Sequence, residues 1–153
     1  MLDRCQSFVR PVLNPQLTGF CTHLIGIRQA NVDSAPRFPV AADALREFVA
    51  RHQQPGSTWT SWGAYDRKQL ERDSARHGVA TPIAVPHQNA KRLFAKSCRI
   101  GKEVGMLKAR ELVRLHLAGT HHRALDDALN GRRRLLPWAL GDRLRVTNRE
   151  GTG

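Results

Sequence analysis

The sequence predicts an α/β domain with about two strands and five or six helices. Its 153 residues are enough for one domain with one sizeable core. Strand-type residues are concentrated in two short segments, 5–13 and 58–62, whereas apolar residues recur at helical spacing elsewhere. Helices in this proportion normally pack on a wider sheet, so we expect part of the sheet to be missing.

The first third of the chain begins with the expected strand at residues 5–13, which an Asn-Pro pair ends. Residues 17–24 follow as a short expected helix that is broken at Gly26, because glycine disfavours helix interiors. Residues 31–36 are polar and rich in turn-formers, and we expect a loop there.

The middle of the chain alternates between helix and strand. Residues 38–52 have a helical apolar rhythm, and residues 58–62 form the second expected strand, because they are β-branched and aromatic. Residues 65–77 are a charge-rich expected helix that ends at Gly78, and a proline-punctuated loop covers residues 79–86.

The last part of the chain is expected to be helical up to a polar tail. Residues 88–98 and 106–116 are two predicted helices, and a final helix runs from residue 121 to about residue 140. Thr120 is a suitable N-cap for that helix. We therefore assign residues 1–141 to the domain and residues 142–153 to a loose C-terminal tail.

The chain is strongly basic, with 25 Lys and Arg against 13 Asp and Glu and a formal net charge of +12. Such a surface attracts polyanions through phosphate neutralisation and counterion release. Twenty of the 25 cationic residues are arginine, whose guanidinium forms a bidentate fork for phosphate oxygens. Charge alone favours a nucleic-acid partner no more than it favours a solvated basic surface.

Several classes are disfavoured by the sequence. The chain contains no apolar run near the ~20 residues that a membrane span needs, and its first residues lack a signal-peptide core. We therefore expect a cytoplasmic protein with no membrane partner. The three cysteines, Cys5, Cys21 and Cys98, are widely spaced without a CxxC pair, which disfavours a disulfide framework or a structural zinc site.

The segment Gly119–Ala128, with the sequence GTHHRALDDA, carries the sharpest local pattern. It places His121 and His122 in the first turn of a helix, where the macrodipole disfavours protonation of imidazole. A neutral imidazole can take a proton from water, and Asp126 or Asp127, one turn later, can hold a hard cation. The alternative is a capped helix start with two surface acids.

A second pattern, SWGAYD at residues 61–66, places an acid after a strand. The strand is expected to end at Gly63 and the helix to start near Asp66. Carboxylates at the carboxyl ends of strands line the active crevice of α/β sheets. Alternatively, Asp66 only complements the helix dipole.

Together these segments resemble a known family. The stretches TWTSWGAYDRKQL (58–70) and GTHHRALDDA (119–128) are similar to the DEDD 3′–5′ exonucleases with a catalytic histidine, which include RNase T and the proofreading subunit of bacterial replicative polymerase. Residues 6–11, 20–27 and 89–95 agree with the same family. The resemblance covers about residues 4–141 and implies a ribonuclease-H-like fold with a mixed sheet flanked by helices.

The resemblance also implies a site. Asp66 and Asp127 match metal-binding acids, His122 matches the catalytic histidine, and Leu24 and Ile27 fall in a segment that packs near the terminal nucleotide. The implied activity is hydrolysis at nucleic-acid 3′ ends by a mechanism with two Mg²⁺ or Mn²⁺ ions, in which His122 is the general base. Single-stranded RNA is the favoured substrate, and DNA is the alternative.

The sequence departs from the family at its first motif, an Asp-x-Glu pair on the first strand, because it contains no Asp-x-Glu. Two ions bring four positive charges, and two aspartates cannot balance them. Three hypotheses follow: a fragment or miscalled start of an exonuclease, a catalytically inactive nucleic-acid-binding or scaffold protein, and a chain whose sheet is completed by a partner or by a second copy.

Overall fold

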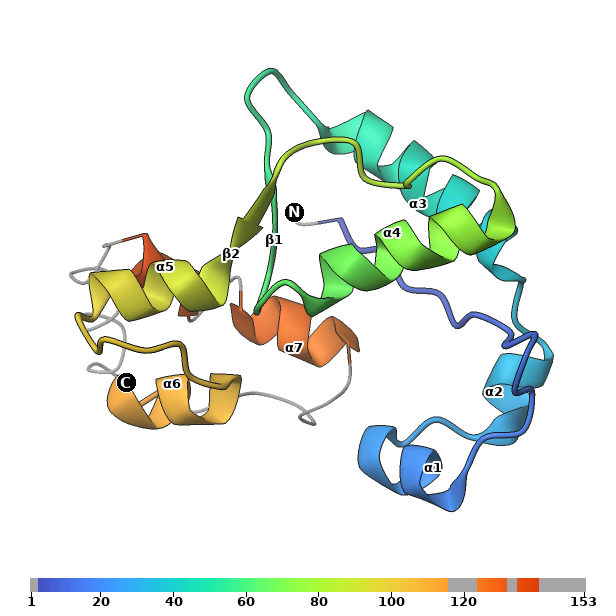
Figure 1. Cartoon of the computed structure of the whole chain (residues 1–153), viewed down its shortest axis with the longest axis horizontal. Helices are drawn as coiled ribbons and strands as arrows, with labels where there is room; N and C mark the ends of the chain where they lie inside the picture. The colour runs from blue at the N-terminus through green and yellow to red at the C-terminus, as the bar shows by residue number, and fades with distance from the viewer. Residues whose placement is uncertain (1–2, 116–123, 132–134, 141–153) are drawn as a thin grey trace, which may run out of the picture. The chain divides into compact units, whose positions relative to one another are not determined.

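The computed structural model describes residues 3–115, 124–131 and 135–140 (Figure 1). These residues divide into two compact units. The first unit comprises Met1–Trp59 and Tyr65–His87, and the second comprises Thr60–Ala64 and Gln88–Gly153.

The first unit is built on two packed helices, α3 (Phe38–His52) and α4 (Tyr65–His77), which lie side by side in Figure 1. Both have the bounds that the sequence predicts. The Phe38 ring stacks on His77 with centroids 5.4 Å apart, and Arg46 donates a hydrogen bond of 2.9 Å to the Ala80 carbonyl. These contacts fix the start of α3 against the end of α4.

Two short helices precede α3, and the first confirms the predicted break at Gly26. Helix α1 (Gly19–Ile25) starts at Thr18, whose hydroxyl accepts from the Cys21 N–H, and ends at Gly26 with φ of 63°. Helix α2 (Gln29–Asp33) is a correction, because a loop was expected over residues 31–36. The Gln29 side chain anchors it, since its amide donates to the Pro15 carbonyl at 2.8 Å and its oxygen accepts from the Leu17 N–H.

The predicted strand at residues 5–13 is wrong for the structure, because residues 3–11 have no regular secondary structure. The Arg10 N–H donates a hydrogen bond of 2.9 Å to the Pro36 carbonyl, a loop residue. A strand exists only when a neighbour completes its ladder of hydrogen bonds. Strand-type composition therefore did not suffice here.

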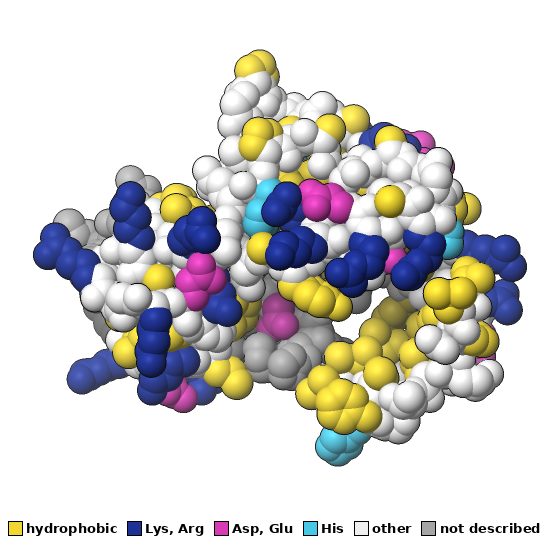
Figure 2. Space-filling view, in the orientation of Figure 1, with side chains coloured by type: hydrophobic (Ala, Val, Ile, Leu, Met, Phe, Trp, Pro, Cys, Tyr) yellow, Lys and Arg dark blue, Asp and Glu magenta, His cyan; other side chains and the backbone are white. Residues whose placement is uncertain are grey.

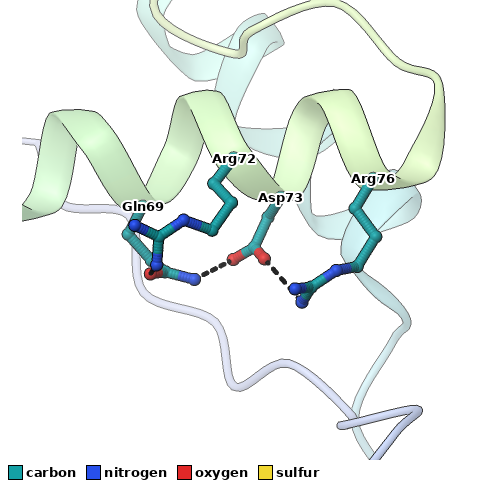
Figure 3. A network of polar contacts seen from close by, with 4 residues as sticks. All are labelled: Gln69, Arg72, Asp73 and Arg76. Carbon is teal, nitrogen blue, oxygen red and sulfur yellow. Dashed lines mark hydrogen bonds and ion pairs between the residues drawn. The ribbon is translucent and has the colours of Figure 1, made fainter.

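One face of α4 carries a chain of polar contacts (Figure 3). Gln69 donates to Asp73 at 2.9 Å, and Asp73 accepts from Arg76 at 3.5 Å. Arg72 donates to the Gln69 oxygen at 3.4 Å. Spacings of three and four residues bring these side chains together, which adds modest stability to a polar helix.

The second unit holds a buried hydrophobic core cluster. Its elements are α5 (Ala90–Ser97), α6 (Met106–Leu112), α7 (Ala124–Asn130) and α8 (Leu136–Ala139). Phe94 and Leu135 are fully buried, and α5 packs on α8. Trp62 packs on Phe94 with ring centroids 5.6 Å apart, and its indole N–H donates to the Val104 carbonyl at 3.1 Å.

The described residues contain a two-stranded sheet of β1 (Trp59–Ser61) and β2 (His87–Asn89). The α/β prediction is confirmed, and β1 lies inside the predicted strand at residues 58–62. The predicted helix at 88–98 is partly wrong, because its first two residues belong to β2 and Asn89 caps α5 by accepting from the Arg92 N–H.

The predicted helix at residues 106–116 ends earlier, at Leu112. Of the predicted helix at 121–140, the described part holds α7 and α8. Thr120 and the tail at 142–153 lie outside the described residues. Across the described ranges, the structure has no helix that is long and apolar enough to cross a membrane.

Candidate functional site

The turn between β1 and α4 sets the position of Asp66. Gly63 has a φ of 119°, a conformation that only glycine adopts without strain. Its N–H donates to the Ser61 carbonyl, and the Ser61 hydroxyl donates to the Gly63 carbonyl, both at 3.0 Å. Helix α4 begins two residues later, so Asp66 lies in its first turn.

The Asp66 carboxylate is exposed. Within the described ranges, no hydrogen bond or ion pair is recorded for it. The adjacent Arg67 instead pairs with Glu71 at 2.9 Å. Asp66 is therefore available to an external cation.

His87 shares the electrostatic surroundings of Asp66. Burial lowers the pKa of His87 below its usual value, the charge of Arg67 lowers it further, and Asp66 and Glu71 oppose this shift. The His87 ring packs against Trp59 with centroids 4.5 Å apart. This ring contact gives His87 a role in packing.

Asp127 belongs to the second unit, whereas Asp66 belongs to the first. Asp126 and Asp127 are half-buried in the first turn of α7. His122 lies outside the described residues. The structure therefore shows the local surroundings of the two metal-binding candidates, each in its own unit.

Leu24 and Ile27 flank the Gly26 turn that ends α1. Leu24 is 41% exposed, Ile27 is half-buried, and Phe20, one turn before Leu24, is 73% exposed. Sequence reasoning did not single out Phe20. Its spacing of four residues from Leu24 on a predicted helix would have placed both on one face.

The candidate ligands, the carboxylates of Asp66 and Asp127, are of the type that binds hard divalent cations. Carboxylate oxygens are the ligands that Mg²⁺ and Mn²⁺ prefer. Across the described part of the chain, no group of three or more His, Cys, Asp or Glu side chains gathers as a metal cluster. Asp66 and Asp127 can each supply oxygen ligands, and a two-ion site needs more carboxylates than these two.

A comparison with protein families decides the assignment. The model of the RNase T family, described as exonuclease, matches residues 2–131. The chain belongs to this exonuclease family. The match includes the segments that carry Asp66, His122 and Asp127.

The curated relatives that are similar to this chain are also named as exonucleases. The chain is 30% identical over 129 residues to the probable 3′–5′ exonuclease KapD of Bacillus subtilis, covering 84% of this chain and 62% of KapD. It is 28% identical over 130 residues to human ERI1 exoribonuclease 3, covering 80% of this chain and 38% of that protein. The chain thus spans less than two thirds of the length of these relatives.

Solved structures agree on the fold. The nuclease domain of 3′hExo, a DEDDh family member bound to rAMP, superposes with a TM-score of 0.70 at 25% identity, over 82% of this chain and 66% of that chain. A 3′-exonuclease that recognises the 3′ end of the histone mRNA stem-loop gives 0.77 at 23% identity, over 92% and 50%. The predicted family and its ribonuclease-H-like fold are confirmed.

Proposed function

We propose that this chain carries the 3′–5′ exonuclease chemistry of its family and acts on single-stranded RNA. The family match over residues 2–131 is the observation that carries the proposal. RNA is favoured over DNA because several similar proteins are named exoribonucleases and because the neighbour at 25% identity binds rAMP. The net charge of +12 is complementary to either polyanion.

Each candidate residue has a distinct role in the proposed reaction. The carboxylates of Asp66 and Asp127 hold the divalent ions, and His122 takes the proton from the attacking water. Bound Mg²⁺ or Mn²⁺ would acidify that water and stabilise the leaving 3′ oxygen. Leu24 and Ile27 contact the terminal nucleotide, and the exposed Phe20 extends that apolar surface.

Charge balance requires further carboxylates. Two ions carry four positive charges, and this sequence contains no Asp-x-Glu pair to add to Asp66 and Asp127. We propose that the missing ligands come from an Asp-x-Glu segment outside this sequence or from a partner or second copy that completes the sheet. Extending the chain with such a segment would then increase activity.

The second candidate is a catalytically inactive nucleic-acid-binding or scaffold protein of the same family. The high net charge and the missing Asp-x-Glu pair favour it. Binding by such a protein would fall steeply with salt and would survive EDTA. It would also survive substitution of Asp66, His122 or Asp127.

A 5′-labelled RNA distinguishes the two functions. We expect a ladder of products shortened from the 3′ end with Mg²⁺ or Mn²⁺, and no products with EDTA. Asp66→Ala, His122→Ala and Asp127→Ala should each abolish the ladder, whereas the matched control Asp73→Ala, on the polar face of α4, should retain it. An Asp-x-Glu-extended chain that binds RNA but cleaves neither RNA nor DNA would overturn the proposal.

A further inference from the structure

Three helices end in the same turn. The residues in its left-handed position are Gly78 after α4, Arg99 after α5 and Arg114 after α6, with φ of 62°, 53° and 53°. In each turn, the N–H of that residue bonds the carbonyl three residues back at 3.2–3.3 Å, and the next N–H bonds the carbonyl five residues back at 3.0–3.2 Å. This is the Schellman motif, in which the left-handed residue is usually glycine.

The two arginines occupy this position against their backbone preference. A side chain in the left-handed region brings Cβ too close to the backbone, and glycine avoids that cost. Within the described ranges, Arg99 and Arg114 are the two non-glycine residues with positive φ. Gly78 shows that glycine forms the same turn in this chain. The turn itself therefore does not require arginine at either position, which directs attention to what the two side chains contact.

The Arg99 side chain lines an open groove of about 480 Å³ on the second unit, here called the α5 groove. The groove is formed by the outer face of α5 and the loop that follows it. Its lining residues are Arg92, Ala95, Lys96, Arg99, Gly101, Lys102 and Glu103. Four cations and one carboxylate give it a net charge of +3, and Figure 2 shows Lys and Arg side chains gathered over this part of the molecule.

Protein groups neutralise little of this charge. Arg92 approaches Glu103 at 3.4 Å, with side chains 79% and 38% exposed, and such surface pairs contribute little. In the part of the chain that the structure describes, no ion pair is recorded for Lys96, Arg99 or Lys102. Arg92 and Lys96 are four residues apart on one helix, where like charges repel. A polyanion seated in the groove would relieve that repulsion.

The geometry points to a backbone-binding site: we propose that the α5 groove binds the phosphodiester backbone of a single-stranded RNA. The choice of RNA rests on the proposed function. Among the described residues, the lining has no aromatic side chain for base stacking and no large apolar side chain for insertion into lipid. It therefore contacts phosphates, without sequence preference. Neither Asp66 nor Asp127 lines the groove.

The two arginines provide a matched pair of variants. Arg99→Gly and Arg114→Gly each remove one exposed charge and one left-handed side chain from the same unit. Of these two arginines, Arg99 lines the α5 groove and Arg114 is not among its described lining residues. Both substitutions should raise the Tm by about 2–4 °C, because glycine relieves the backbone. A lower Tm in both variants would contradict the strain argument.

Binding of a 5′-fluorescein oligouridylate, followed by anisotropy in EDTA, tests the groove on the full chain. Arg99→Gly should weaken binding about fivefold at 0.1 M salt and reduce the salt slope by about 0.7. Arg99→Lys should keep the slope, and Arg114→Gly should keep wild-type affinity. Equal losses in the Arg99→Gly and Arg114→Gly variants, or no loss in Arg99→Gly, would overturn the proposal.

Because no metal is present in this assay, its outcome is separate from catalysis. If Arg99→Gly weakens binding but the chain yields no ladder with Mg²⁺ or Mn²⁺, the groove proposal stands and the proposed exonuclease activity is wrong. If the chain cleaves RNA but Arg99→Gly binds RNA like wild type, the proposed activity stands and the groove proposal is wrong.

Discussion

Gly63 is the position where backbone geometry most directly controls the candidate site. At φ of 119°, an alanine is strained by about 1–3 kcal/mol. A Cβ added there would meet the Lys91 Cδ at 4.0 Å, which is an ordinary van der Waals contact and adds no clash. The reduced entropy of the unfolded chain returns about 0.4–1 kcal/mol. Gly63→Ala should therefore destabilise the protein by about 1–2 kcal/mol.

Urea unfolding measures this effect. With a slope of about 2 kcal/mol/M, the midpoint for Gly63→Ala should fall by about 0.5–1 M at unchanged slope. The matched control is Gly19→Ala, at the first residue of α1, where a Cβ meets nothing within 4 Å. The control should be neutral or slightly stabilising. A wild-type midpoint for Gly63→Ala would refute the reasoning.

Four further predictions concern the core and the surroundings of Asp66. Phe94→Ala should lower the free energy of unfolding by about 3–5 kcal/mol in denaturant titrations, because this fully buried ring is lost from the core of the second unit. Trp62→Phe removes the donor to the Val104 carbonyl and should lower the free energy of unfolding by about 1 kcal/mol in the same assay. The control is Tyr65→Phe, whose side chain is 74% exposed. A smaller loss for Trp62→Phe than for this control would contradict the hydrogen bond. His87 should titrate by NMR below the usual 6.5, so stability should fall as the pH drops through 6.5 towards the lowered pKa. Asp66→Asn should lower the pKa of His87 further, because Asp66 opposes the shift.

Helix bounds were predictable where the ends carry their own signals. The helix at Phe38–His52 begins beside a proline at its first turn, and Tyr65–His77 ends at Gly78 in the left-handed region. These signals act within a few residues, so the sequence contains them in full.

Strands were harder to predict because pairing is non-local. Residues 5–13 have strand composition, but residues 3–11 have no regular structure, whereas the polar segment His87–Asn89 pairs with β1. Strand propensity describes fit to a neighbouring surface more than an intrinsic preference. Whether a strand forms depends on the segment that pairs with it, and the local sequence does not identify that segment.

The candidate site shows the same division. The first-turn position of Asp66 follows from local helix signals, and the structure places it there. Asp127 was expected one turn after the start of a helix at residue 121, and it lies in the first turn of α7 (Ala124–Asn130). Their metal-binding role comes from the family resemblance and stays a prediction. The α5 groove was not predictable, because a left-handed Arg99 has no glycine signal and because the groove depends on the fold of the loop after α5.

The most direct test of the proposed chemistry is an EPR titration of Mn²⁺ into the wild-type chain and four variants. Asp66→Asn and Asp127→Asn should each weaken Mn²⁺ binding about tenfold or more, because each removes a charged oxygen ligand. Asp73→Asn and Asp126→Asn, matched acids on α4 and α7, should bind like wild type. Unchanged Mn²⁺ affinity in both the Asp66→Asn and Asp127→Asn variants would contradict the account, because neither carboxylate would then be a metal ligand.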